Sequence, residues 1–279
     1  MLEVSFLDVG QGDAAFVVLP DGTTILIDGG GRPGFTTRGE QVDDEEMFEP
    51  DRRSIGEAVV SEYLWWRGLD HIDYVLATHA DADHIQGLTD VVRNFRVRSA
   101  FVARAPADNR EYRRFAEALE GRGVPVEVIG AGDTLRAASV EISVLWPRLT
   151  TDGALASGNN DSLVLMLQYE RRRVLFTGDV EAAAERQLLA QNADVQCDVA
   201  KVAHHGSRTS SVADFVERAH ASWAIISVGQ RSPFRHPAPE VVERWREQGA
   251  RADHGPLRHD YGDERRRRLA ISNLCATVR

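Results

Sequence analysis

The sequence predicts an α/β protein built as a four-layer α/β/β/α sandwich, in which two sheets pack face to face and helices cover both outer faces. Strand-like runs fall into two groups along the chain, with helical patterns between the runs. Several of the apolar runs end on clusters of polar, chemically reactive side chains. Sheets that carry helices on one face bury their other face against each other, and the four-layer architecture follows from this.

The composition indicates a folded globular protein. The chain has 279 residues, of which 43% are hydrophobic and 27% charged, as in ordinary soluble domains. An α/β domain of this length is within the usual range, so we expect residues 1–279 to form a single domain. No stretch reaches the ~20 uncharged apolar residues of a membrane span, and the N-terminal residues lack the pattern of a signal peptide. The chain as given is therefore expected to be soluble.

The formal net charge of −10 argues against a broad basic surface for nucleic acid, although a local basic groove is compatible with it. The arginine runs at residues 171–173 and 265–268 are interpreted as solvated faces or hairpin tips. The two cysteines, Cys197 and Cys275, are too few to define a disulfide framework and are interpreted as buried thiols.

The N-terminal half is predicted to form the first sheet and its helices. Short strand-like runs separated by turns that contain glycine or proline open the chain as an antiparallel meander. Residues 29–53 are rich in glycine, charge and turn formers without periodicity, which predicts a long surface loop. Apolar periodicity then alternates between helix and strand. The predicted strands are residues 2–9, 15–19, 23–27, 73–78, 99–103 and 124–129, and the predicted helices begin at Ser54, after His84 and at Arg110.

The C-terminal half is predicted to form a second sheet. Two apolar runs joined by Glu170-Arg171-Arg172 are typical of a hairpin, and shorter strands then alternate with helices. The predicted strands here are residues 140–145, 162–169, 173–177, 198–203 and 223–228, and the predicted helices are residues 181–191, 212–219 and 239–248.

The run His79-Ala80-Asp81-Ala82-Asp83-His84 places four metal-capable side chains within six residues, directly after an apolar strand. Aspartate is common in turns, so a purely structural polar turn is the alternative. Two histidines among the carboxylates favour a metal site instead. The end of a strand is a suitable position, because a loop there holds side chains convergent while leaving them open to substrate.

Two later segments also end apolar strands on metal-capable residues. Gly178-Asp179 follows one strand, and its carboxylate could bridge two cations. His204-His205-Gly206-Ser207 follows another and combines two imidazoles with a glycine that allows close approach of the backbone. Each segment alone would usually be structural. Their recurrence at three strand ends favours a shared site.

These segments give the chain a resemblance to a known family. The sequence resembles the metallo-β-lactamase superfamily and, within it, the soluble C-terminal nuclease-type domain of the ComEC-like competence proteins. The resemblance spans nearly the whole chain, in the order found in the family. The matching segments are residues 7–14, 26–30, 79–84, 159–164, 176–179 and 204–207.

The resemblance implies a binuclear metal site. His79 and Asp81 would belong to one metal subsite and Asp83 and His84 to the other, with Asp179 bridging them. His204 would complete the ligand set, although the choice between His204 and His205 stays open. The implied catalytic residues are Asp83, His205 and His236, and the implied substrate-binding residues are Asn160, Asp161, Ser207, Arg208 and Arg235. The Gly10-Gln11-Gly12-Asp13 segment is assigned to the rim of the site by the resemblance alone.

Two departures from the superfamily pattern affect these expectations. Asp81 stands where the usual run has a second histidine, a change shared with the ComEC-like branch. The segment Ser232-Pro233-Phe234-Arg235-His236-Pro237 keeps the family's histidine but not its asparagine and glycine. With three carboxylates and no thiolate, the site is expected to hold two divalent metal ions, with manganese favoured and zinc an alternative.

The function expected from this reading is metal-dependent hydrolysis of a phosphodiester, with DNA as the substrate. Two alternatives stay open because a fold does not fix a function. One is hydrolysis of a lactone or thioester, and the other is an iron-dependent oxidoreductase or a non-catalytic module. A ComEC-like role in competence would place the chain in or beside a membrane DNA-uptake channel. It would then be extracytoplasmic, whereas a stand-alone protein would be cytoplasmic.

Overall fold

The computed structural model describes residues 1–32, 53–106, 108–149, 158–229, 232–253 and 275–278. The first part of the chain contains β1 (Glu3–Leu7), β2 (Ala15–Val18), β3 (Thr24–Ile27), the π-helical turn η1 (Gly56–Ser61), α1 (Glu62–Trp66), β4 (His71–Ala77), α2 (Ala82–Asn94), β5 (Arg96–Val102), α3 (Arg110–Gly121) and β6 (Val126–Val128). The second part contains β7 (Thr134–Ala137), β8 (Val140–Trp146), the 3₁₀ turn η2 (Gly158–Asp161), β9 (Val164–Tyr169), β10 (Arg172–Phe176), α4 (Ala182–Ala190), β11 (Val199–Lys201), the 3₁₀ turn η3 (Ala203–Gly206), α5 (Ala213–Ala219), β12 (Trp223–Ile225), α6 (Pro239–Glu247), β13 (Arg251–Asp253) and β14 (Cys275–Val278).

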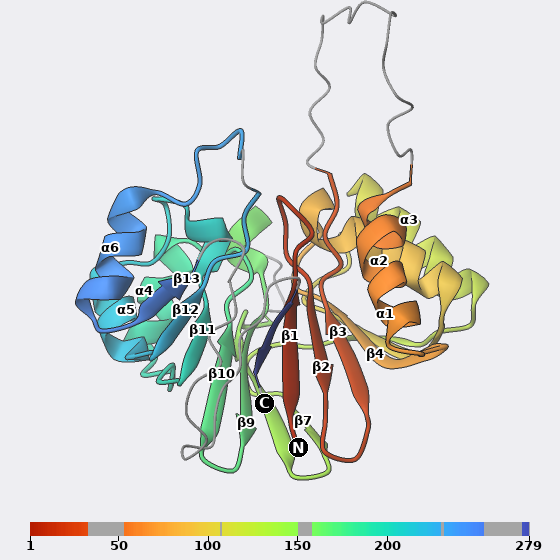
Figure 1. Cartoon of the computed structure of the whole chain (residues 1–279), viewed down its shortest axis with the longest axis horizontal. Coiled ribbons are helices and arrows are strands. Elements are labelled where there is room, and N and C mark those ends of the chain that lie inside the picture. Colours follow the sequence, from red (N-terminus) through yellow and green to blue (C-terminus); the bar gives the residue numbers. More distant parts are fainter. Residues whose placement is uncertain (33–52, 107, 150–157, 230–231, 254–274, 279) are drawn as a thin grey trace, which may run out of the picture.

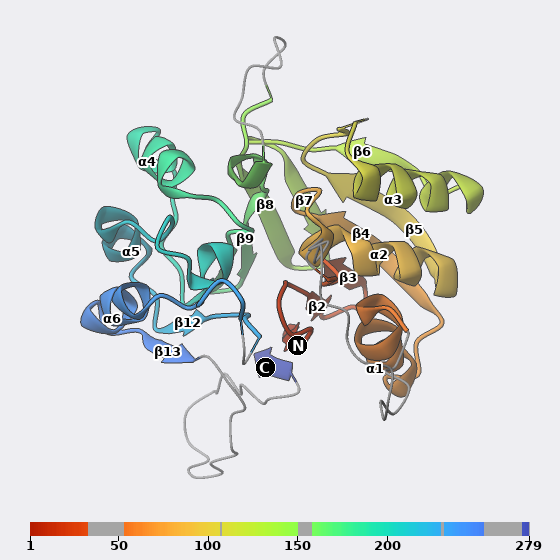
Figure 2. The same cartoon turned by 90° about the horizontal axis from the view of Figure 1, so that it is seen from above.

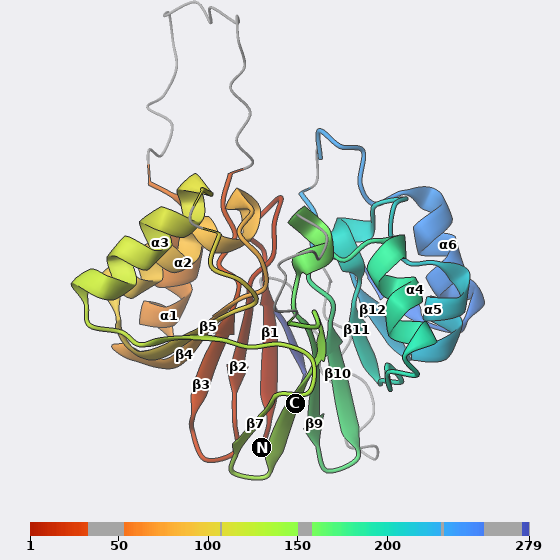
Figure 3. The ribbon, with the colours of Figure 1, turned by 180° about the vertical axis from the view of Figure 1, so that it is seen from behind.

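Within the described residues these strands form two seven-stranded sheets, of order β14-β1-β2-β3-β4-β5-β6 and β13-β12-β11-β10-β9-β8-β7. The sheets face each other, with α1 to α3 outside one and α4 to α6 outside the other (Figures 1 and 2). The view from behind shows the same two helical layers on opposite sides (Figure 3). The predicted four-layer α/β/β/α sandwich is therefore confirmed.

Apolar side chains account for this layering. One buried cluster lies between the sheets, where Phe6 of β1 and Phe176 of β10 approach to 5.9 Å between ring centroids. A second cluster packs sheet residues against α4 to α6 and includes the buried rings of Trp146 and Trp245. A third joins the first sheet to α1, α2 and α3. Burial on both faces explains why β3, β4 and β10 carry nearly continuous apolar runs in the sequence.

Each sheet has an antiparallel half and a parallel half. In the first sheet β14, β1, β2 and β3 are antiparallel neighbours, whereas β3, β4, β5 and β6 run parallel. The second sheet repeats this plan, with β7 to β10 antiparallel and β10 to β13 parallel. Ligands in open α/β sheets bind beyond the carboxyl ends of parallel strands. The segments that follow β3, β4, β10 and β11 are therefore brought to a common edge.

The structure differs from the sequence prediction in its details. Helix α2 begins at Ala82, so Asp83 and His84 lie in its first turn and not in the preceding loop. Strands β7, β13 and β14 are not predicted by the sequence, since short strands at sheet edges carry little apolar periodicity. Of the predicted loop 29–53, residues 29–31 are buried, and residues 33–52 lie outside the described part. No helix in the described part is long and apolar enough to cross a membrane.

Glycines allow the segment after β3 to lie directly on α2. Gly29 donates to the carbonyl of His84 over 2.7 Å, and Gly87 donates to the carbonyl of Gly30 over 2.9 Å. A Cβ built on Gly87 would overlap the carbonyl oxygen of Gly29. This close backbone contact fixes the first turn of α2, which carries Asp83 and His84, against the end of β3.

We predict that Gly87→Ala lowers the free energy of unfolding by about 1–3 kcal/mol, because the added methyl group forces α2 away from the Gly29 backbone. The matched control is Gly121→Ala, also in a helix, where an added Cβ meets nothing within 4 Å. Chemical denaturation of both variants measures the difference. Equal stabilities would contradict the close packing described for Gly87.

Candidate metal centre

Four buried side chains from different elements meet at the common edge of the two sheets. His84 comes from the first turn of α2, Asp179 follows β10, and His205 follows β11. Asp13, from the turn after β1, joins them, and one potential ligand atom from each of the four lies within 4.8 Å of the others. All four are less than a tenth exposed. The site is thus built by segments that are far apart in the sequence.

Three of these side chains, together with Asp83, present atoms with the spacing of metal ligands. The Oδ2 atom of Asp179 lies 3.2 Å from Nε2 of His84 and 3.3 Å from Nε2 of His205. Nε2 of His205 lies 3.4 Å from Oδ2 of Asp83. Around a divalent cation that binds nitrogen and oxygen at about 2.0–2.2 Å, neighbouring ligand atoms lie roughly 3.0–3.6 Å apart. The three distances given above match the spacing of ligand atoms around one cation.

Both imidazoles are held by their other nitrogen. Nδ1 of His84 donates to Oδ2 of Asp28 over 2.9 Å, and Nδ1 of His205 donates to the carbonyl of Ser227 over 2.9 Å. Asp28 is itself fixed by Thr78, whose backbone amide and hydroxyl donate to its two oxygens. Carboxylate and carbonyl acceptors of this kind orient metal-binding histidines in proteins. The buried Nε2 atoms of His84 and His205 have no hydrogen-bond partner among the described residues.

His79 and Asp81 lie beside this group and suit a second metal subsite. The His79 ring lies 4.1 Å from the His84 ring, and its Nε2 atom is buried, without a hydrogen bond, 3.8 Å from Oδ2 of Asp81. Nδ1 of His79 lies 3.0 Å from the Thr78 hydroxyl. Burial, and then the charge of His84, lower the pKa of His79. A neutral imidazole is the form that binds metals.

The charge distribution favours a cation. Burial opposes the charged forms of His84 and His205. The negative charges of Asp179 and Asp28 at His84, and of Asp179 and Asp13 at His205, outweigh burial and raise the pKa of both imidazoles well above its ordinary value. Burial also opposes ionisation of Asp179, but the two histidines outweigh it and lower the pKa of Asp179 well below its usual range. The raised pKa values of the two imidazoles thus show how strongly these carboxylates attract positive charge. A bound metal would supply that charge in their place.

The two histidines of the His204-His205 pair differ in their surroundings. Both adopt left-handed backbone conformations, with φ values of 49° and 53°. This sharp turn points the buried His205 ring at the carboxylates. His204 instead lies 3.3 Å from a carboxylate oxygen of Glu181 and 3.3 Å from the amide nitrogen of Asn159. The structure therefore brings His205 into the ligand cluster and leaves His204 beside it.

The other candidate residues have varied placements. Asn160 accepts a hydrogen bond from the backbone of Glu181 and serves the fold. Ser207 is buried and pairs with the Thr209 hydroxyl.

Arg208 and Arg235 are exposed, and Arg208 lies 3.8 Å from Glu240. The His236 ring lies 5.8 Å from that of His204, and burial, followed by the charges of His204 and His205, lowers the pKa of His236 to about 4.

Three residues at the site were not assigned a role at the metal centre from the sequence. Asp13 was expected at the rim but is buried in the cluster, and Asp28 holds His84. Lys201 places its ammonium group against Asp13 and 3.7 Å from Oδ1 of Asp179. The available signals were the position of Asp28 at the end of a strand and the position of Lys201 within an apolar strand. A lysine that is fully buried is almost always paired.

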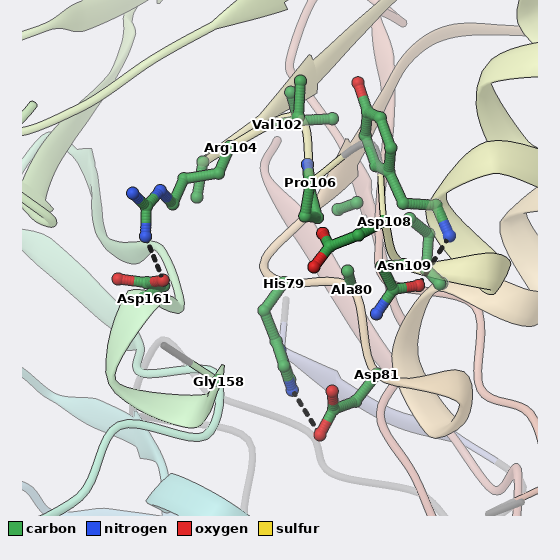
Figure 4. A pocket seen from close by; sticks show the side chains of 15 residues that line it. His79, Ala80, Asp81, Val102, Arg104, Pro106, Asp108, Asn109, Gly158 and Asp161 are labelled. Carbon is green, nitrogen blue, oxygen red and sulfur yellow. Dashed lines mark hydrogen bonds and ion pairs between the residues drawn. The ribbon is translucent and has the colours of Figure 1, made fainter. Parts of the chain in front are cut away.

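A pocket of about 520 Å³ opens beside His79 and Asp81. Its opposite side carries Arg104, whose guanidinium lies 2.6 Å from a carboxylate oxygen of Asp161 (Figure 4), and Asp108 also lines the pocket. Asp161 therefore lines the pocket beside Arg104, and its described ion pair is with Arg104 and not with the candidate metal ligands. The volume is within the range of pockets that hold small molecules.

The segment that carries His204 and His205 is anchored by a buried carboxylate of α4. Glu185 accepts hydrogen bonds from the backbone amides of Ser211 and Val212. Its side chain is fully buried, and this burial raises the pKa of Glu185 to about 7 despite the two amide donors. Residues 207–212 are thereby tied to α4.

A family comparison and two relatives extend these observations. The model of the "Metallo-beta-lactamase superfamily" matches residues 7–229. The chain is similar to "ComE operon protein 3" of Bacillus subtilis, with 30% identity over 247 residues that cover 86% of this chain and 30% of the relative. It is also similar to "Recombination protein 2" of Haemophilus influenzae, with 27% identity over 242 residues, 87% of this chain and 26% of the relative. The chain thus spans under a third of these relatives, and the expected resemblance to competence proteins is confirmed.

Two solved structures share the fold. The metallo hydrolase Igni18 from Ignicoccus hospitalis superposes with a TM-score of 0.50 at 16% identity, covering 90% of this chain and 94% of that one. The diiron β-hydroxylase CmlA from Streptomyces venezuelae gives a TM-score of 0.51 at 16% identity, covering 90% of this chain and 52% of that one. At these identities the likeness concerns the fold alone.

We predict that Glu185→Gln removes a pH-dependent component of stability. Folding raises the pKa of Glu185 from 4.5 to about 7, so the folded state binds more protons between these values. The contribution of Glu185 to the free energy of unfolding is fully present below pH 4.5 and is lost as the pH rises through about 7, a change of roughly 3 kcal/mol. Denaturation of wild type and variant from pH 4 to 8 measures it, with the exposed Glu217→Gln as control. Parallel stability curves for wild type and Glu185→Gln would refute it.

We also predict that Asp28→Asn weakens binding of a divalent metal by about 10- to 100-fold, because the amide no longer holds His84 by a charged acceptor. Asp73→Asn is the matched control. Like Asp28, Asp73 accepts hydrogen bonds from the backbone amide and the hydroxyl of a threonine and so links β3 to β4. Its partner, however, is Thr24. Titration of both metal-free variants with Mn²⁺ measures the affinity, and equal affinities for the two would disprove the role of Asp28.

Proposed function

Since the chain belongs to the metallo-beta-lactamase superfamily, we propose that it is a metal-dependent hydrolase that cleaves phosphodiester bonds in DNA. The observation that carries this proposal is the convergence of the unpartnered Nε2 atoms of His84 and His205 on Asp179 and Asp83. These residues would hold one divalent cation, and His79 and Asp81 would hold another, with Asp179 bridging. Bound metals would activate a water molecule as nucleophile and stabilise the charge that develops on phosphate oxygens.

The protein's own residues would bind the substrate and move the proton. His204 is better placed than His205 to protonate the leaving oxygen, because His205 turns its Nε2 atom to the ligand cluster. Nδ1 of His204 faces Glu181 at 3.3 Å, and such a carboxylate orients an imidazole for proton transfer. With its pKa lowered to about 4, His236 is neutral at pH 7 and would act as a hydrogen-bonding group.

The pocket beside His79 suits one nucleotide unit next to the scissile phosphate. Its side walls combine Arg104 with the carboxylates of Asp108 and Asp161, so it carries more acidic than basic groups. A second phosphate would be repelled there, whereas the hydrogen-bond donors of a base or sugar would be accepted. Phosphates of a longer strand would instead meet exposed arginines such as Arg208 and Arg235.

DNA is proposed because the matched relatives are named for competence and recombination, namely the proteins of Bacillus subtilis and Haemophilus influenzae described above and, over a shorter stretch, "Competence protein ComA" of Neisseria gonorrhoeae. A DNA-uptake complex is the corresponding proposed partner. Manganese is the proposed metal, since a site with three carboxylates and no thiolate is harder than histidine-rich zinc sites.

The test is turnover by the chelated protein before and after addition of Mn²⁺, Zn²⁺ or Fe²⁺. The substrates are single- and double-stranded DNA, RNA, a cyclic dinucleotide, bis(p-nitrophenyl) phosphate, a lactone and a thioester. We expect cleavage of DNA, with the highest rate in Mn²⁺. Turnover of only the lactone or thioester would overturn the proposal, as would redox turnover that requires Fe²⁺.

We predict that Arg208→Ala and Arg235→Ala slow the cleavage of DNA by about 3- to 10-fold more than that of bis(p-nitrophenyl) phosphate, because only the long substrate reaches beyond the metals. The net charge of −10 leaves few phosphate contacts, so the salt dependence should correspond to about two to four ions. Arg218→Ala, at the far end of α5, is the control. Equal losses on both substrates would show that these arginines do not bind DNA.

A further inference from the structure

Lys201 is a buried cation inside the candidate metal centre. It ends β11, and its side chain is 5% exposed. Its ammonium group contacts Oδ2 of Asp13, lies 3.7 Å from Oδ1 of Asp179 and donates to the carbonyl of Gly178 over 3.4 Å. It is also the only lysine among the chain's 33 basic residues, which are otherwise all arginines. Among the described residues, Lys201 is the buried side chain that brings an ammonium group to these carboxylates.

Asp13 lies behind the histidines, on the side away from the proposed metal. Its Oδ2 atom is 3.7 Å from Nδ1 of His84, and its Oδ1 atom is 3.6 Å from Nδ1 of His205. The atoms that converge with Asp83 and Asp179 are instead the Nε2 atoms. Distance alone would allow Asp13 to be a metal ligand. Its contact with Lys201 and its position behind the rings point to a different role.

Asp179 is shared between the two sides. Its Oδ2 atom faces Nε2 of His84 and His205, and its Oδ1 atom faces Lys201. An ammonium group at Oδ1 withdraws negative charge from the carboxylate that would bridge the metals. At short range in a buried site, such a charge interaction greatly exceeds thermal energy. Lys201 and a metal at Oδ2 thus compete for the same carboxylate.

We propose that Lys201 is a built-in counter-cation that neutralises Asp13, keeps Asp13 out of the metal-ligand set and limits the affinity of the site for divalent cations. The inference rests on the proposed function in that both require a bound metal. Lys201 acts through Asp13 and Asp179 and is therefore a positioning residue. Without its charge, Asp13 would become a free buried carboxylate beside the metals.

The test is a titration of metal-free protein with Mn²⁺ alone, followed by calorimetry and by metal content after gel filtration. Lys201→Met removes the ammonium but keeps an apolar chain of similar length. We expect its Mn²⁺ affinity to rise about tenfold or more, because Asp13 and Asp179 lose their counter-cation. Its melting temperature should fall without metal and recover more than that of wild type when Mn²⁺ is added.

Asp13→Asn should have the opposite effect, a roughly tenfold loss of affinity, because Lys201 then acts on Asp179 alone. The double variant should return close to the wild-type affinity, since both charges of the pair are gone. A lysine that only supports the fold would lower melting temperatures with and without metal equally and leave the affinity unchanged. That result, or weaker Mn²⁺ binding by Lys201→Met, would overturn the inference. Failure of wild type itself to bind Mn²⁺ would instead refute the proposed function.

Discussion

The constraint on which the structure depends is the burial of several carboxylates at one edge of two sheets. Asp13, Asp28 and Asp179 are each less than a tenth exposed, and Asp83 lies beside them. Buried carboxylates at this spacing repel one another unless positive charge or hydrogen-bond donors compensate them. The described residues supply one ammonium and two imidazoles whose pKa values are raised. A bound cation would add to this compensation and would also give the site a chemical use.

The topology explains why these groups can be held so close. Each sheet changes from antiparallel to parallel pairing, at β3 in one and at β10 in the other. The chain therefore leaves β3, β4, β10 and β11 in the same region, and glycines at 29 and 87 let α2 approach the end of β3. Rigid strands support the candidate metal ligands, while the residues proposed to face a substrate lie on the loops beyond them.

Much of this could be predicted from the sequence, because the signals are local. Apolar runs that end on residues 79–84, 178–179 and 204–207 predict the fold class and the region of the candidate metal centre. The choice between His204 and His205 could not be predicted, since it depends on two consecutive left-handed residues. The roles of Asp28 and Lys201 depend on contacts with His84 and Asp13, which come from distant parts of the chain. Periodicity carries no information on such pairings.

The most direct test of the account is the affinity for Mn²⁺ of two neighbouring variants, His205→Asn and His204→Asn. The account predicts that His205→Asn loses at least tenfold in affinity, because Nε2 of His205 converges with Asp83 and Asp179. His204→Asn should bind Mn²⁺ as wild type does. The reverse pattern, or equal affinities for both variants, would contradict the metal centre described here.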